Sequence, residues 1–443
     1  MTRAPLERVI GVGGLGCAAI NCIVGSGIFG LPGIAAAMLG PAAVLAYLVC
    51  AVLIGLVGLC FAEVGSRVAH GGGLYGYATE SFGPIVGGVA GTLLWVANSI
   101  VPNAAVANLL VDTAATASPA LGSGTGRATF LAVLYAGLAA VNIRGARSGA
   151  RLSVAMAAIK IGPLVLLVLA GTFAVRLSNL QWTGMPPART IGQTAVLLFF
   201  AFMGVEGGLN TSGEVRDPAR TVPRAIFTAL TLVAALYIGL QVVAQGVLGP
   251  ALPGATAPLV AAAGAIFGPW GARLIVVTTA LSAAGFLSAD LLGSPRNVHA
   301  LASRGQLPGA LAAVHPRFKT PALAVGLYAA TCALVAWTGS FRQLVVVGTS
   351  GTLALYLICC VGLIPLRARN VAAHGKPFLA PGGMAVPLAA AAIIVWMLST
   401  LAWSELAAAA VLVVTSGAVY FVQHRWRRQA VAEPVVASPL SER

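Results

Sequence analysis

Charged residues are what this sequence lacks most. Only 8% of its 443 residues are Asp, Glu, Lys or Arg, and only 11 residues are acidic. A soluble domain carries about 25% charged residues, so the chain has too few to cover a water-facing surface. This scarcity excludes a soluble enzyme and a disordered protein. The 7 cysteines are odd in number, lie in apolar stretches and form no CxxC pair, so neither a metal site, nor another cofactor site, nor a disulfide framework is expected.

Apolar residues and glycine are abundant in the sequence instead. Hydrophobic residues make up 58% of the chain, and its 54 glycines suit helices that pack closely in lipid. A run of about 20 mostly apolar residues is long enough to cross a bilayer. The sequence therefore predicts an all-α, polytopic membrane protein in the lipid bilayer. Its twelve expected transmembrane helices are at 10–38, 42–64, 84–112, 128–144, 151–175, 191–212, 223–248, 272–300, 321–338, 341–365, 385–403 and 405–424.

Basic residues predict the orientation of these helices. Of the 26 Lys and Arg residues, 20 fall on the side that would hold both termini and 5 on the opposite side. Cytoplasmic loops carry such an excess, so the tails 1–9 and 425–443 are expected in the cytoplasm and the protein in the inner membrane. The net charge of +15 is then explained by loops that face anionic lipid, without a nucleic acid partner.

Two of the expected spans are interrupted near their middles. The first contains Gly25-Ser26-Gly27 followed by Pro32, and the sixth contains Gly204-Val205-Glu206-Gly207-Gly208. Glycine at this density weakens a helix, and proline removes a backbone donor. Corresponding breaks in the first helix of each five-helix half indicate a transporter built from inverted repeats.

Several strings resemble the amino acid–polyamine–organocation (APC) superfamily of permeases, most of all its basic amino acid/polyamine antiporter group. They are the stretches 25–29, 63–75, 199–206, 213–226 and 294–308, in the family's order. The resemblance implies a LeuT-type fold. Two inverted five-helix repeats would occupy 10–175 and 191–365, and two peripheral helices would occupy 385–424.

The broken helices supply the candidate substrate site. Freed backbone N–H groups at residues 25–27, a serine hydroxyl and a positive helix end suit a carboxylate, although a GxG packing notch has the same sequence. The resemblance implies that this stretch binds an α-carboxylate and that carbonyls of both breaks receive the α-amine. The expected substrate-binding residues are Ile23, Gly25, Ser26, Gly27, Phe200, Met203, Gly204, Glu206 and Asp290.

Three of the ionisable residues within the expected spans are candidates for a function, because charge inside a membrane is costly. Glu206 either titrates as a proton carrier or is a carboxyl bonded to the broken backbone. Lys160 either extends to the interface or, as the resemblance implies, reaches the cavity that sodium fills in sodium-coupled relatives. Asp290 either pairs with a cationic substrate or bonds Ser or Thr on a neighbouring helix. Lys160 and Glu206 are the expected coupling residues.

These features predict a secondary active amino acid transporter that works by alternating access. It would be proton-linked or would exchange an amino acid for a related amino acid or polyamine. Arginine–agmatine antiport is one variant, although Phe200 stands where those exchangers carry tryptophan. No nucleophile constellation or Walker loop points to an enzyme. The alternatives are a channel and a non-transporting membrane sensor or structural subunit, and relatives include both monomers and homodimers.

Overall fold

The computed structural model describes residues 11–68, 73–116, 118–122, 124–144, 150–182, 184–205, 218–303, 308–372 and 377–432, and all regular structure in them is helical. The first half contains α1 (Val12–Ile23), η1 (Gly27–Phe29), α2 (Leu31–Leu39), η2 (Gly40–Ala43), α3 (Val44–Arg67), α4 (Gly73–Phe82), α5 (Pro84–Trp95), η3 (Val96–Ile100), α6 (Val101–Ala115), η4 (Pro119–Leu121), α7 (Gly124–Arg144), α8 (Ala150–Gly171), η5 (Thr172–Ala174) and η6 (Leu177–Leu180). The second half contains α9 (Ala188–Phe199), η7 (Phe200–Phe202), α11 (Pro218–Leu248), η9 (Gly249–Gly254), α12 (Pro258–Phe267), α13 (Pro269–Ser303), η10 (Gly309–Ala312), α14 (Ala322–Thr338), α15 (Phe341–Ala368), α16 (Ala385–Ser399) and α17 (Trp403–Ala432).

Helices long and apolar enough to cross a membrane confirm a polytopic helical membrane protein. Six stretches of the described residues meet that criterion, and shorter apolar helices accompany them. The six are Leu31–Arg67, Pro84–Ala115, Gly124–Arg144, Arg224–Gly254, Pro269–Arg296 and Phe341–Ala368. The count of twelve spans stays a prediction.

Two helices that the sequence did not predict are α4 and α12, each of 10 residues. Both are too short to cross a bilayer, so a search for long apolar runs passes over them. Pro258 begins α12, because a proline in the first turn of a helix costs no backbone hydrogen bond. Gly268, with φ of +70°, ends it.

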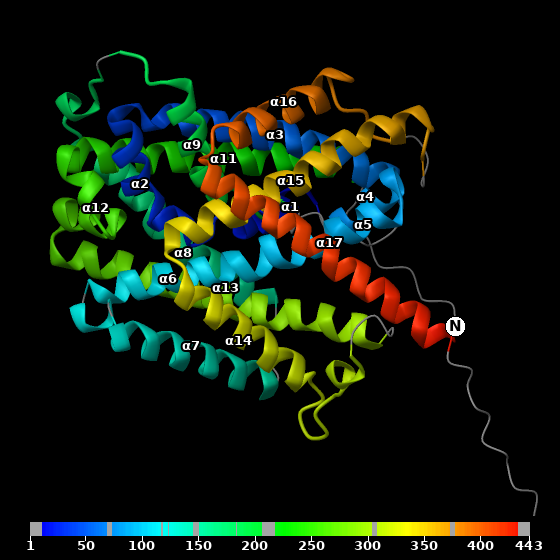
Figure 1. The fold of residues 1–443 in the computed structure, drawn as a ribbon. Coiled ribbons are helices and arrows are strands. Elements are labelled where there is room, and N and C mark those ends of the chain that lie inside the picture. The colour runs from blue at the N-terminus through cyan, green and yellow to red at the C-terminus, as the bar shows by residue number, and fades with distance from the viewer. Residues whose placement is uncertain are drawn as a thin grey trace, which may run out of the picture.

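Most of the helices pack side by side in one bundle (Figure 1). Helix α11 contacts both α1 and α3, and α15 contacts α3, α6 and α16, so segments far apart in the chain are interleaved. In the view of Figure 1, α7 and α14 lie together at the lower edge and α3 and α16 at the upper edge. The helix-to-helix contacts bury a continuous apolar core that includes residues of both broken helices.

Large apolar side chains also cover the outside of the bundle. Examples are Val133 on α7, Leu169 on α8, Trp337 on α14 and Val414 on α17, all more than 60% exposed. The α14 example is typical, because Leu323, Leu327 and Leu334 of that helix are exposed as well. Such a surface is compatible with hydrocarbon rather than with water, as expected of a multi-pass membrane protein.

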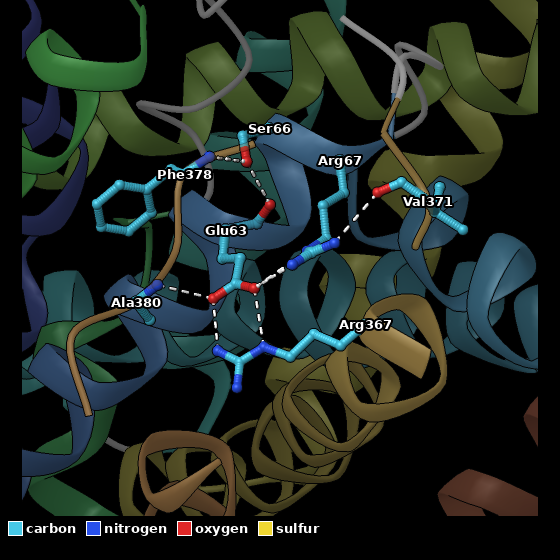
Figure 2. Close-up of polar contacts among 7 residues, drawn as sticks. All are labelled: Glu63, Ser66, Arg67, Arg367, Val371, Phe378 and Ala380. Carbon is cyan, nitrogen blue, oxygen red and sulfur yellow. Dashed lines mark hydrogen bonds and ion pairs between the residues drawn. The ribbon is translucent and has the colours of Figure 1, made fainter. Parts of the chain in front are cut away.

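A buried ion cluster, defined here as Glu63, Arg67 and Arg367, ties the ends of α3 and α15 together (Figure 2). Arg67 donates from Nε and Nη2 to Oε1 of Glu63, at 3.0 and 2.8 Å. Arg367 donates from Nε to Oε1 at 2.8 Å and from Nη2 to Oε2 at 2.6 Å. The backbone N–H of Ala380 adds a bond of 2.8 Å to Oε2. One carboxylate therefore joins two helices and the segment that leads to α16.

The Glu63 side chain is fully buried, and the two guanidinium groups are 6% and 16% exposed. A buried carboxylate is tolerated because five donors replace the water that it has lost. The acidic group is also outnumbered by its two cations, so the cluster keeps a net positive charge. Removal of Glu63 would leave two buried guanidinium groups without their counter-ion.

We expect Glu63→Gln to lower the free energy of unfolding by about 3 kcal/mol, the scale of a broken buried ion pair. The matched control is Asp112→Asn, since Asp112 pairs with Arg127 at 2.7 Å but both side chains are partly exposed, at 33% and 23%. An exposed pair contributes about 1 kcal/mol or less. Thermal unfolding of the detergent-purified variants measures both changes. Equal shifts for the two variants would contradict the importance of the buried cluster.

Candidate substrate site at two broken helices

The first predicted helix break is confirmed. Helix α1 ends at Ile23, and Val24 has φ of −72° and ψ of 83°, outside the helical region. The chain then forms the short segment η1 and enters α2, which carries Pro32 in its first turn. The proline favours a helix start there for the reason given for α12. The amino end of α2, with its partial positive charge, therefore points into the break.

The second predicted break is confirmed as well. Helix α9 ends at Phe199, η7 covers the next three residues, and Met203 is extended with ψ of 156°. Gly204 has φ of +106°, a conformation that a residue with a side chain rarely adopts. Glu206 lies outside the described residues, so its two interpretations remain predictions.

The two breaks touch each other. A Cβ at Gly204 would lie 2.7 Å from the carbonyl oxygen of Cys22, and a Cβ at Gly27 would lie 2.7 Å from Cδ1 of Phe200. Glycine at both positions therefore allows the unwound backbones to approach. The Phe200 ring packs edge-on against Phe341 of α15 at a centroid distance of 6.2 Å. The predicted residues at 23–27 and 200–204 are thus brought together at one place.

Ser26 carries an unsatisfied hydroxyl at this place. Its side chain is 1% exposed, and Oγ has no hydrogen-bond partner among the described residues. Most buried polar atoms have a partner, and an orphaned one costs about 1–3 kcal/mol. Gly25 and Gly27 flank the hydroxyl, and α2 begins five residues further on. The arrangement offers a donor to an anionic oxygen that the chain itself does not provide.

Tyr237 of α11 is a site residue that the sequence did not reveal. Its fully buried hydroxyl lies 3.2 Å from the carbonyl oxygen of Ile23 and 3.0 Å from that of Ala201. The Ile23 carbonyl also accepts the backbone N–H of Gly25 at 2.7 Å. One side chain therefore holds an acceptor of each broken helix. No sequence motif marks it, because its partners are backbone atoms.

Lys160 of α8 reaches the first broken helix. Nζ donates to the carbonyl oxygen of Asn21 at 2.6 Å, near the end of α1. Through this bond Lys160 links α8 to α1. The coupling role of Lys160 stays a prediction.

Asp290 of α13 lies in a different polar network. Its carboxylate accepts hydrogen bonds from Ser99, Asn103, Ser294 and Tyr328, at 2.6–2.8 Å. None of these partners belongs to η1 or η7. Of the two interpretations left open by the sequence, bonding to neighbouring hydroxyl groups is the one that the structure displays, and contact with a substrate stays a prediction.

The fold and the paired breaks define a multi-pass helical membrane protein in which two broken helices touch inside the bundle. The chain belongs to the amino acid permease family, whose model matches residues 11–424. This confirms the resemblance noted from the sequence. The members of this family are permeases, which move a solute and carry out no covalent reaction.

Three relatives indicate how widely substrates vary around this fold. The chain is 26% identical over 439 residues to the methylthioribose transporter of Bacillus subtilis, covering 95% of this chain and 94% of the relative. It is 25% identical over 438 residues to the branched-chain amino acid permease of the same bacterium, with the same coverage. The serine/threonine exchanger of Bacillus subtilis is 30% identical over 326 residues, covering 69% of this chain and 71% of the exchanger.

We expect Tyr237→Phe to destabilise the protein by about 1–3 kcal/mol, because two buried carbonyls lose a shared donor. Tyr47→Phe is the matched control: Tyr47 is also fully buried, but its hydroxyl has no hydrogen-bond partner. Removal of that orphaned hydroxyl should leave stability unchanged or raise it. Thermal unfolding of the two variants compares them directly, and a larger loss for Tyr47→Phe would show that the carbonyl contacts of Tyr237 contribute little.

Proposed function

We propose that this protein is a secondary active amino acid transporter of the inner membrane that works by alternating access. Both termini would be cytoplasmic. Residues 10–175 and 191–365 would form two inverted five-helix repeats with a LeuT-type arrangement, and 385–424 two further helices, giving twelve spans. Membership of the amino acid permease family and the two contacting helix breaks support this proposal.

The observation that carries the substrate site is the Ser26 hydroxyl, which lies between two glycines, five residues before α2, and has no partner among the described residues. An α-carboxylate placed there accepts a hydrogen bond from Ser26 and interacts favourably with the helix end. The carbonyls of Phe200 and Met203 are the proposed acceptors for the α-amine. The Ile23 carbonyl was also expected to accept from the α-amine. It already accepts from Gly25 and Tyr237, so its main role is to stabilise the break.

Alternating access follows from what holds the broken helices. The half-helices on either side of each break are joined by short unwound segments, which change direction more easily than intact helix. A substrate that contacts both breaks would therefore favour the states in which the half-helices close around it. The side chain of the substrate would extend toward Phe200, whose ring forms one wall of the site.

Coupling is proposed to use Lys160, with Glu206 as a second titrating group. The Lys160 ammonium donates to the Asn21 carbonyl at 2.6 Å and so places a positive charge at a position beside α1 that a metal cation could otherwise take. Transport would then be proton-linked, or would exchange one amino acid for a related amino acid or polyamine. Arginine–agmatine exchange is one such variant, and a homodimer is one expected assembly.

Counterflow in liposomes tests the transport proposal. Liposomes loaded with one unlabelled amino acid should accumulate the same labelled compound transiently, because a carrier exchanges substrate in a saturable way. A thermal-shift screen of the purified protein against amino acids and polyamines selects the compound, since only binders raise the melting temperature. A channel would give no transient accumulation, and a membrane sensor would show a thermal shift without flux.

Ser26→Ala should raise the dissociation constant of an amino acid about tenfold, since a hydrogen bond to a charged group contributes about 1.5 kcal/mol or more. Stability without ligand should not fall, because the hydroxyl has no partner. Ser416→Ala is the matched control, since that serine on α17 is equally 1% exposed and unpartnered. Equal affinities in Ser26→Ala and Ser416→Ala would exclude the proposed carboxylate site.

Uptake should not depend on sodium if the Lys160 ammonium holds the cation position. We expect equal initial rates in sodium and choline buffers at constant pH. In Lys160→Ala the ammonium is replaced by a space lined by the Asn21 carbonyl, and the rate should fall in both buffers. A wild-type requirement for millimolar sodium would contradict the role of Lys160.

A further inference from the structure

The network around Asp290 joins several helices inside the bundle. Ser99 comes from η3, Asn103 from α6, Asp290 and Ser294 from α13, and Tyr328 from α14. Ser99 and Ser294 donate to Oδ1 of Asp290 at 2.7 and 2.8 Å. Asn103 and Tyr328 donate to Oδ2 at 2.7 and 2.6 Å. The hydroxyl of Ser99 also lies 2.5 Å from that of Ser294 and 2.7 Å from that of Tyr328.

The network has fewer hydroxyl hydrogens than it has close oxygen–oxygen contacts. Five close oxygen–oxygen contacts join the Asp290 carboxylate and three hydroxyls. Each hydroxyl supplies one hydrogen, so an ionised carboxylate leaves two of the five contacts with lone pairs facing each other. The amide of Asn103 provides its own hydrogen and does not alter the count. An additional proton would satisfy one of the two contacts.

The charge of Asp290 leads to the same conclusion. No ion pair of Asp290 is recorded among the described residues, and its donors are neutral hydroxyl and amide groups. The titratable groups that interact with Asp290 among the described residues are Tyr328 and Cys332 on α14 and Tyr135 on α7, and none of them is cationic at neutral pH. Lys160, on the adjacent helix α8, donates to the Asn21 carbonyl instead. A carboxylate inside a membrane protein without a cation is costly, and a proton removes that cost.

We propose that Asp290 is a proton-binding site, held by the hydroxyls of Ser99, Ser294 and Tyr328. A proton from water forms an O–H bond at Oδ2, and this new hydroxyl donates to Oη of Tyr328. The Tyr328 hydroxyl then turns to donate to Ser99. Four of the five contacts now contain a hydrogen, and no heavy atom has to move. The reverse rotation returns the proton to water.

The surroundings of Asp290 suit such a switch. Asp290 is partly exposed, whereas Ser99, Asn103, Ser294 and Tyr328 are less than 9% exposed, so the carboxyl is the least buried member of the network. Asn103 is held in place because its Oδ1 accepts the hydroxyl of Tyr135 at 2.8 Å. Ser99 belongs to a π-helical turn, Val96–Ile100, and such turns are frequent at functional sites because they redirect side chains.

The coupling role of this proton rests on the proposed transport function, whereas proton binding by Asp290 does not. If the protein is a proton-linked transporter, the proton on Asp290 is the coupling ion, bound on one side of the membrane and released on the other. Binding of the proton itself is a property of the purified protein. The two statements are therefore tested separately.

Infrared spectroscopy of the full chain in lipid tests proton binding without a substrate. A protonated carboxyl has a C=O stretching band that disappears on ionisation. A band that titrates with pH should be present in the wild type and in Asp112→Asn, and absent in Asp290→Asn. In Tyr328→Phe the band should remain but shift in frequency, because Oδ2–H loses its acceptor; this variant serves if Asp290→Asn does not fold. Identical titrating bands in the wild type and Asp290→Asn, or no shift in Tyr328→Phe, would overturn the proposal.

Initial uptake rates from acidic to neutral pH test the coupling role. The rate should vary with pH in the wild type and in Asp112→Asn, and the variation should be lost in Asp290→Asn. Loss of the variation in Glu206→Gln with retention in Asp290→Asn would overturn the coupling role of Asp290. A titrating Asp290 band in a wild-type protein that moves no solute would leave the proton site in place and contradict the transport function instead.

Discussion

Backbone hydrogen bonding inside an apolar bundle is the constraint on which the rest of this structure depends. Two helices unwind among buried residues, so their carbonyl and N–H groups need partners from the protein or from a ligand. Tyr237 and Lys160 supply donors from two other helices, at Ile23, Ala201 and Asn21. Close approach of the two breaks requires a glycine at 204. Ser26 Oγ, which has no partner among the described residues, lies at this contact between the breaks.

The breaks were predictable because glycine and proline act locally, through φ angles and missing donors. The groups that stabilise them were not. Tyr237 lies in an apolar run whose aromatic residue could equally face lipid, and its partners are backbone atoms more than 30 residues away. The short helices α4 and α12 were not predicted, because a search for apolar runs of bilayer length does not detect them. The helix breaks could therefore be predicted from the sequence, and the contacts between distant helices could not.

Asp290 shows the same division within one residue. Its position in an apolar span marked it as functional, and the two interpretations followed from the chemistry of a carboxylate. The choice between them depends on neighbours from η3, α6 and α14, which the chain brings together only in the folded bundle. The hydrogen count that leads to the proton site requires all of these distances at once. A single sequence contains no such information.

The hydrogen bond between Ala380 and Glu63 also shows whether α16 and α17 can be separated from the rest of the bundle. Helices α16 and α17 follow the expected ten-helix repeat region and resemble an appendage that could be deleted. Yet the segment before α16 supplies a donor to the buried carboxylate, and the N–H of Phe378 bonds the Ser66 hydroxyl at 3.0 Å. A chain shortened after α15 would lose both bonds and open the ion cluster to solvent. The last two helices are therefore integral to this end of the helix bundle, and modular swaps between relatives need to include residues 377–380 along with them.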